Sequence, residues 1–144
     1  MLTEILIGSA VIVATVIIEC TFISIAISTL TRAGGWLSQR GNLIRMILVL
    51  GGLTLWLLAG ISAALWLWAL LFVLLGEFDS VRQAIYFASV SATTLGYGDQ
   101  LLSDRWNLLS GFIAANGLVL FSLNTAFLFE ALRRLSPAEV RNRE

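Results

Sequence analysis

The groups best suited to chemistry in this chain belong to the main chain of one short segment. Residues 93–99 read TTLGYGD, with Gly96 and Gly98 separated by one residue. Glycine adopts positive φ readily, so this spacing allows consecutive carbonyl oxygens to face the same way. A row of such oxygens can replace the hydration shell of a cation, and the Thr94 hydroxyl adds one more oxygen at the end of the row. The segment therefore predicts a cation site built from backbone oxygens.

Side-chain chemistry has little support elsewhere in the sequence. The chain has no histidine and no lysine, and Cys20 is its one cysteine. No nucleophile stands beside a base, and no residues show the spacing of metal ligands. Nine arginines balance nine carboxylates, which does not make the basic surface that nucleic acids require. We therefore expect no enzymatic activity, no organic cofactor and no nucleic-acid partner.

The composition is that of an integral membrane protein. Of 144 residues, 58% are hydrophobic and 12% are charged, and the mean hydropathy is +0.91. Three apolar segments, residues 5–30, 46–76 and 106–129, are each long enough to cross a bilayer of about 30 Å. Residues 31–42 are rich in Gly, Ser and Arg and predict a loop, and Pro137 is expected to stop the last helix before a short tail. The fold class expected is an all-α membrane protein with three transmembrane helices.

A fourth, shorter helix is predicted directly before the TTLGYGD segment. Ser80 and Gln83 fit a capping box, so a helix of about three turns should start there and run to Ala92. It is too short to span, and the chain must leave and re-enter the membrane on the same side. Backbone at membrane depth is tolerated only where protein buries it or water lines it. A re-entrant pore loop meets that condition.

The TTLGYGD segment resembles the selectivity filter of potassium channels, whose usual form is TVGYG preceded by Thr and followed by Asp. Outer helix, pore helix, filter and inner helix follow in that family's order. The sequence thus resembles bacterial channels of the pore-loop superfamily with an extra N-terminal helix. The resemblance divides the chain into a peripheral helix and cytoplasmic loop (1–42), a pore module (43–135) and a short cytoplasmic tail (136–144). The alternative is a simple turn, since Gly and Asp are common turn residues.

The resemblance also implies roles for single residues. It assigns K⁺-coordinating oxygens to Thr94, Leu95, Gly96 and Tyr97, places Gly98 in the same filter, and gives filter support or the outer mouth to Thr93, Asp99 and Asp104. One chain carries one filter segment, so the implied partners are three identical subunits, together with membrane lipid. Leu95 departs from the usual Val or Ile, which weakens the case for strict selectivity. Asp99 lacks its usual partners, because Val90 and the pair Tyr86-Phe87 stand where some members have Glu and two Trp residues. Tyr86 or Arg82 would have to replace them, or Asp99 is simply solvated.

The third span has one helical face formed by residues at steps of three and four. The face includes Ser110, Ala114, Gly117, Phe121, Asn124 and Leu128. By resemblance, Gly117 lies near a hinge of the inner helix, and Phe121 with Asn124 or Thr125 lines a cavity. Glu130 then falls at the cytoplasmic mouth. The alternatives are that the face only packs against neighbouring helices and that Glu130 pairs with Arg133 or Arg134 on its own helix.

Glu19 lies near the middle of the first span, where an ionisable residue is costly unless it is neutral or paired. We expect it to face another helix in a neutral or hydrogen-bonded state, with a proton sensor as the alternative. Trp36 and Trp106 stand beside the proposed membrane interfaces, as aromatic anchors do.

Arginine placement predicts the orientation, because cytoplasmic loops carry an excess of positive charge. Seven arginines fall on one side (Arg32, Arg40, Arg45, Arg133, Arg134, Arg141 and Arg143) and two on the other (Arg82 and Arg105). We therefore expect a multi-pass protein of the inner (cell) membrane with its N-terminus outside and its C-terminus in the cytoplasm. Two alternatives to a potassium-selective channel are a weakly selective cation channel and a non-conducting subunit of another channel.

Overall fold

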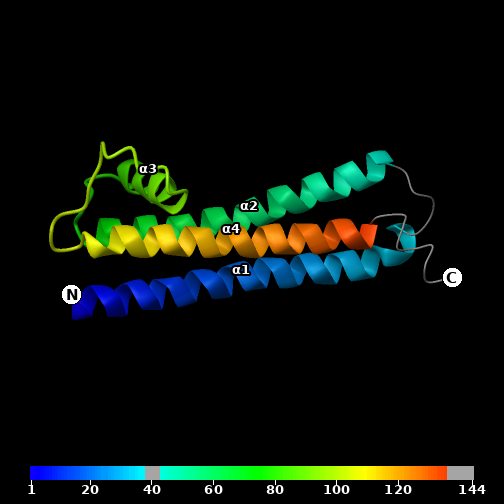
Figure 1. The fold of residues 1–144 in the computed structure, drawn as a ribbon, viewed down its shortest axis with the longest axis horizontal. Coiled ribbons are helices and arrows are strands. Elements are labelled where there is room, and N and C mark those ends of the chain that lie inside the picture. The colour runs from blue at the N-terminus through cyan, green and yellow to red at the C-terminus, as the bar shows by residue number, and fades with distance from the viewer. Residues whose placement is uncertain (38–42, 136–144) are drawn as a thin grey trace.

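The computed structural model describes residues 1–37 and 43–135, and every regular element in these two ranges is a helix (Figure 1). The helices are α1 (Leu2–Leu37), α2 (Leu43–Leu74), α3 (Val81–Ala92) and α4 (Leu108–Leu135). The three long helices run side by side, and the short α3 packs against α2 and α4 at one end of the bundle. The N-terminus lies at the same end as α3, and α4 ends at the other.

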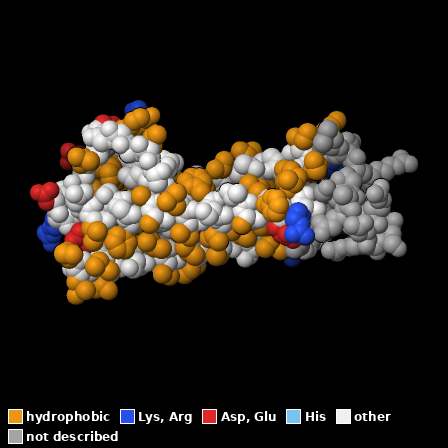
Figure 2. Space-filling view, viewed as in Figure 1, with side chains coloured by type: hydrophobic (Ala, Val, Ile, Leu, Met, Phe, Trp, Pro, Cys, Tyr) orange, Lys and Arg blue, Asp and Glu red, His pale blue; other side chains and the backbone are white. Residues whose placement is uncertain are grey.

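The three long helices have the length and composition of membrane spans. Their apolar stretches are Leu2–Arg32, Ile44–Leu74 and Leu108–Arg133. On the face in Figure 2, charged side chains gather near the two ends of the bundle, and apolar side chains cover the length between them. The chain is therefore an all-α membrane protein with three apolar spanning helices and one short helix, as the sequence predicts.

The boundary of the first helix differs from the prediction. α1 continues to Leu37, so the loop expected from residue 31 was placed too early. The Thr31 hydroxyl still donates to the Ser28 carbonyl within the helix. Each glycine in a helix costs only about 1 kcal/mol relative to Ala, which does not end a long apolar helix. Residues 38–42, Pro137 and the tail lie outside the described residues.

An aromatic core joins α3 to the outer helix α2. Phe72 of α2 contacts Phe87 of α3 edge to face, with ring centroids 5.3 Å apart, and Trp68 lies 5.7 Å from Phe72. Trp106 is buried in the same core. It is therefore not the exposed membrane anchor that its position predicts, and the side chain of Trp36 lies outside the described residues. The core fixes α3 against the bundle from the side of α2.

Candidate functional site

The N-terminus of α3 is set by the cap that the sequence predicts. Ser80 precedes the helix in an extended conformation, and its side chain accepts a hydrogen bond from the Gln83 backbone N–H. At the other end the helix stops at Ala92, and the Thr93 hydroxyl donates to the Ser89 carbonyl at 2.8 Å. These contacts determine where the TTLGYGD segment begins.

The backbone of this segment alternates in handedness. Positive φ angles occur at Thr94 (59°), Gly96 (55°) and Gly98 (75°), and not at Leu95 or Tyr97 between them. In an extended strand, successive peptide groups point to opposite sides. Reversing the sign of φ at every second residue removes that alternation. The positive φ predicted for the two glycines is confirmed, and Thr94 shares it although it is strained for a residue with a Cβ.

The start of the segment is held by one acceptor at the end of α3. The Val90 carbonyl accepts from the backbone N–H groups of Leu95 at 3.0 Å and Gly96 at 3.3 Å. The side chains that follow are poorly covered within one chain, since Leu95 is 56% exposed and Tyr97 is 68% exposed. Hydrogen bonds within the chain thus hold the backbone at the start of the segment. No part of the chain that the structure describes covers the Leu95 and Tyr97 side chains to a comparable extent.

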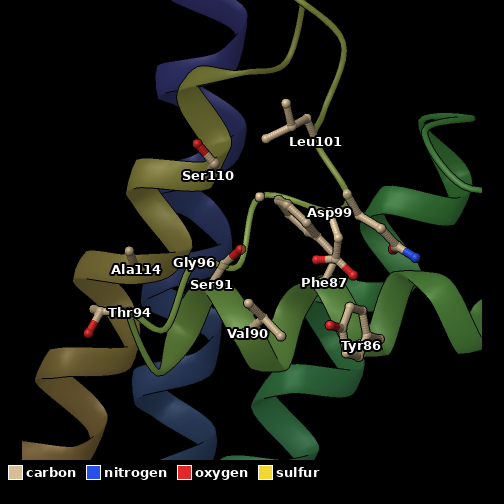
Figure 3. Close-up of a pocket in the computed structure, with 12 residues that line it drawn as sticks. Tyr86, Phe87, Val90, Ser91, Thr94, Gly96, Asp99, Leu101, Ser110 and Ala114 are labelled. Atoms are coloured by element: carbon tan, nitrogen blue, oxygen red, sulfur yellow. The ribbon is translucent and has the colours of Figure 1, made fainter.

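A pocket of about 330 Å³ lies beside the segment (Figure 3). Tyr86 and Val90 of α3 line one part of it, Ser110 and Ala114 of α4 line another, and Gly96 belongs to the segment itself. The lining is mainly apolar, but it also includes hydroxyl groups and the polar side chains of Asp99 and Gln100. The pocket is therefore a partly polar hollow beside the segment.

Asp99 at the end of the segment has a partner in α3. The Tyr86 and Asp99 side chains lie near each other (Figure 3), and hydrogen bonding to Asp99 raises the pKa of Tyr86 above its ordinary value. Of the two substitutes considered for the usual partners of this Asp, the structure favours Tyr86 over Arg82. Asp104 lies on the exposed surface of the following loop.

The loop around the segment is closed by a contact that the sequence did not predict. The Glu77 carboxylate accepts from the Ser103 backbone N–H at 2.6 Å and from the Ser103 hydroxyl at 2.8 Å. The two residues are 26 positions apart. They join the chain before α3 to the chain after the TTLGYGD segment, so both ends of the re-entrant loop are tied together.

The C-terminal end of α3 packs directly against Gly117 of α4, and we call this contact the seat of α3. A Cβ built on Gly117 would lie 2.0 Å from the carbonyl oxygen of Ala92. The helix has no room for any side chain at this position, because the obstacle is backbone. Close packing is thus a sufficient reason for this glycine, in addition to the hinge that the resemblance implies.

The other predicted residues of α4 divide between two environments. Asn124 is buried within the chain, on the side where Glu19 lies, whereas Thr125 is exposed and donates to the Phe121 carbonyl. Within one chain Thr125 is the more exposed of the two alternatives for a cavity-lining residue, and the assignment of a cavity to either one stays a prediction. Phe121 is half-buried and packs on the cluster formed by Ile61, Ala64 and Leu120.

Glu130 at the far end of α4 has the partner that helix spacing suggests. Its carboxylate lies 4.0 Å from the Arg133 guanidinium, and both side chains are largely exposed. The side chain of Arg134 lies outside the described residues.

Glu19 faces a neighbouring helix, as predicted. It is fully buried, and its oxygens lie against Gly60 of α2, where a Cβ would come within 2.8 Å of Oε2. One turn nearer the N-terminus, a second buried polar cluster joins Thr15 of α1, Trp68 of α2 and Asn116 of α4. Sequence reasoning missed this cluster. An Asn in an apolar span is itself a signal, because polar groups in membranes require partners.

Comparison with known families identifies most of the chain. A family model described as "Ion channel" matches residues 43–134, nearly two thirds of the sequence. The matched region begins at α2 and includes α3, the TTLGYGD segment and α4. It leaves out α1. No curated protein and no solved structure matches the chain.

Proposed function

Because the chain belongs to the ion channel family, a family of transporters and not of enzymes, we propose that four copies of it form a potassium-selective pore. The pore conducts K⁺ passively across the membrane. The observation that carries this proposal is the alternation of positive φ at Thr94, Gly96 and Gly98. It supports the proposal because it removes the regular alternation that would turn every second carbonyl to the opposite side.

Potassium is the ion that such a row of oxygens suits. K⁺ channels replace the hydration shell of the ion with carbonyl oxygens from four TVGYG segments, and residues 93–99 have a related sequence. The coordinating oxygens in this proposal belong to Thr94, Leu95, Gly96 and Tyr97. Asp99 and Asp104 would make the outer mouth negative and raise the local cation concentration.

The incomplete packing around the segment supports assembly into a closed ring. Irregular backbone at membrane depth must be buried in protein or line a water-filled path. In one chain the Leu95 and Tyr97 side chains are exposed, and the pocket beside Gly96 is open. Identical subunits around a closed symmetry axis would cover these surfaces and align four rows of carbonyls.

The proposed orientation has the N-terminus and the re-entrant loop outside the cell. It rests on the arginine bias and agrees with the position of both features at the same end of the bundle (Figure 1). A cysteine introduced by Thr3→Cys in a Cys20→Ser background should react with an impermeant thiol reagent added to intact cells. Labelling only after lysis would reverse the orientation.

Gly96→Ala tests the role of the backbone. The change removes no coordinating atom, but left-handed backbone costs a residue with a Cβ about 1–2 kcal/mol, so the carbonyl row should be lost and K⁺ flux into liposomes abolished. Gly76→Ala is the matched control. Gly76 also has positive φ (74°) and open space around it, yet it lies outside the segment. Flux should persist in that variant, and normal flux through assembled Gly96→Ala would refute the proposal.

A further inference from the structure

The cluster that joins α1 to the pore module is centred on one side-chain oxygen. Asn116 Oδ1 lies 2.9 Å from Trp68 Nε1 and 2.9 Å from the Thr15 hydroxyl. A carbonyl oxygen has two lone pairs, so it can accept from both donors at once. The donors come from α2 and α1, and the acceptor from α4. All three side chains are buried, with Thr15 fully so.

Asn116 stands directly before the seat of α3. The next residue is Gly117, on which the carbonyl of Ala92 rests so closely that no Cβ would fit. Ala92 is the last residue of α3, two positions before Thr94, the first residue of the segment with positive φ. A rotation of α4 about its axis at Asn116 would therefore move the support of the segment.

Trp68, the donor from α2, connects Asn116 to α3 by a second route. Trp68 stacks against Phe72, and Phe72 contacts Phe87 of α3. The two routes from Asn116 thus reach the middle of the buried face of α3, at Phe87, and its C-terminal end, at Ala92. One of them passes through α4 and the other through α2.

We infer that Asn116 is a positioning residue for the TTLGYGD segment and that α1 acts on the pore through Thr15. The inference rests on the proposed function, because its readout is ion flux. It gives a role to α1, which lies outside the matched ion channel region. In this role α1 supplies a hydroxyl that holds the Asn116 side chain, so it is part of the machinery that sets the geometry of the segment.

The Thr15 hydroxyl has a second acceptor, which sets the size of the effect. It lies 2.8 Å from the Ile12 carbonyl in its own helix, so its one hydrogen serves either oxygen. Hydrogen bonds between helices in membranes contribute about 0.6 kcal/mol on average. We therefore expect loss of this hydroxyl to change the relative permeability of K⁺ and Na⁺ by no more than about threefold, without loss of assembly.

The test compares Thr15→Val with Thr15→Ser in protein reconstituted into planar bilayers. Valine keeps the shape and removes the hydroxyl, whereas serine keeps the hydroxyl. The reversal potential between K⁺ and Na⁺ solutions gives the permeability ratio, and sizing in detergent gives the assembly. Thr21→Val is the matched control, because the Thr21 hydroxyl bonds only to the Ile17 carbonyl on an exposed face of the same helix.

The inference predicts a shifted ratio for Thr15→Val and an unchanged ratio for Thr15→Ser and Thr21→Val. An assembled Thr15→Val channel with the ratio of the original protein would overturn it, as would an equal shift in Thr15→Ser. If Thr15→Val does not assemble, Trp68→Phe decides, since it removes the other donor and keeps a ring. Absence of any flux through the unaltered protein would instead refute the proposed function itself.

Discussion

The re-entrant loop and the polar side chains beside α1 differ in how far one chain buries them. At the re-entrant loop, the backbone of residues 93–99 is organised within one chain, while Leu95 and Tyr97 remain exposed. Where α1 packs against the other helices, the polar side chains of Thr15 and Glu19 of α1 and Asn116 of α4 are all buried within the same chain. The first region leaves apolar side chains exposed in one chain, and the second is buried within it. Under the proposed function, other copies cover the first region. Mutations in the loop should therefore act on the pore directly, whereas mutations beside α1 should act on it only through Asn116.

The largest effect is expected at the junction of the two regions. Gly117→Ala would place a Cβ 2.0 Å from the Ala92 carbonyl oxygen, and backbone on both sides cannot yield. We expect a loss of about 3 kcal/mol or more, seen as a lower temperature at which the assembled protein dissociates in detergent. Gly111→Ala in the same helix meets no atom within 4 Å and should be neutral or slightly stabilising. Equal behaviour of the two variants would contradict the seat proposed for α3.

A smaller effect is expected in the interior beside α1. Gly60→Ala would bring a Cβ within 2.8 Å of Glu19 Oε2 and 3.1 Å of Phe22 Cγ. The end of a glutamate side chain can move where backbone cannot, so we expect a loss of about 1 kcal/mol in the same dissociation assay. The permeability ratio should stay unchanged, because Glu19 lies away from the segment. A change in selectivity without a change in stability would show that Glu19 also acts on the segment.

The smallest effect is expected at the exposed pair Tyr86 and Asp99. The hydrogen bond raises the pKa of Tyr86, so its contribution to stability is complete below the ordinary value of about 10 and is lost as pH rises through the raised value. Asp99→Asn should lower the midpoint of Tyr86 ionisation. Absorbance titration in a Tyr97→Phe background reports Tyr86 alone, since the chain has two tyrosines. An unchanged midpoint would mean that Asp99 is solvated.

Local features were predictable because their signals lie within a few residues. The Ser80 cap, the positive φ of Gly96 and Gly98 and the ion pair of Glu130 with Arg133 each depend on neighbours in sequence. Apolar length likewise predicted the three spans, although glycine-rich composition placed the end of α1 too early.

The remaining features depend on residues that are far apart in sequence. Ser103 meets Glu77 across 26 positions, and Asn116 meets Thr15 across 101. No periodicity predicts such pairs, because the approach of whole helices decides them. The positive φ of Thr94 was also missed, since propensity alone disfavours it and the surrounding structure imposes it.

The central claim is that this one chain assembles into a potassium-selective pore. The most direct test is to reconstitute the purified protein alone, measure its native mass in mild detergent and record the reversal potential between K⁺ and Na⁺ solutions. We predict a mass of four chains and a potential near that of a K⁺-selective membrane. A stable dimer as the largest species, no current, or equal permeability to both ions would contradict it.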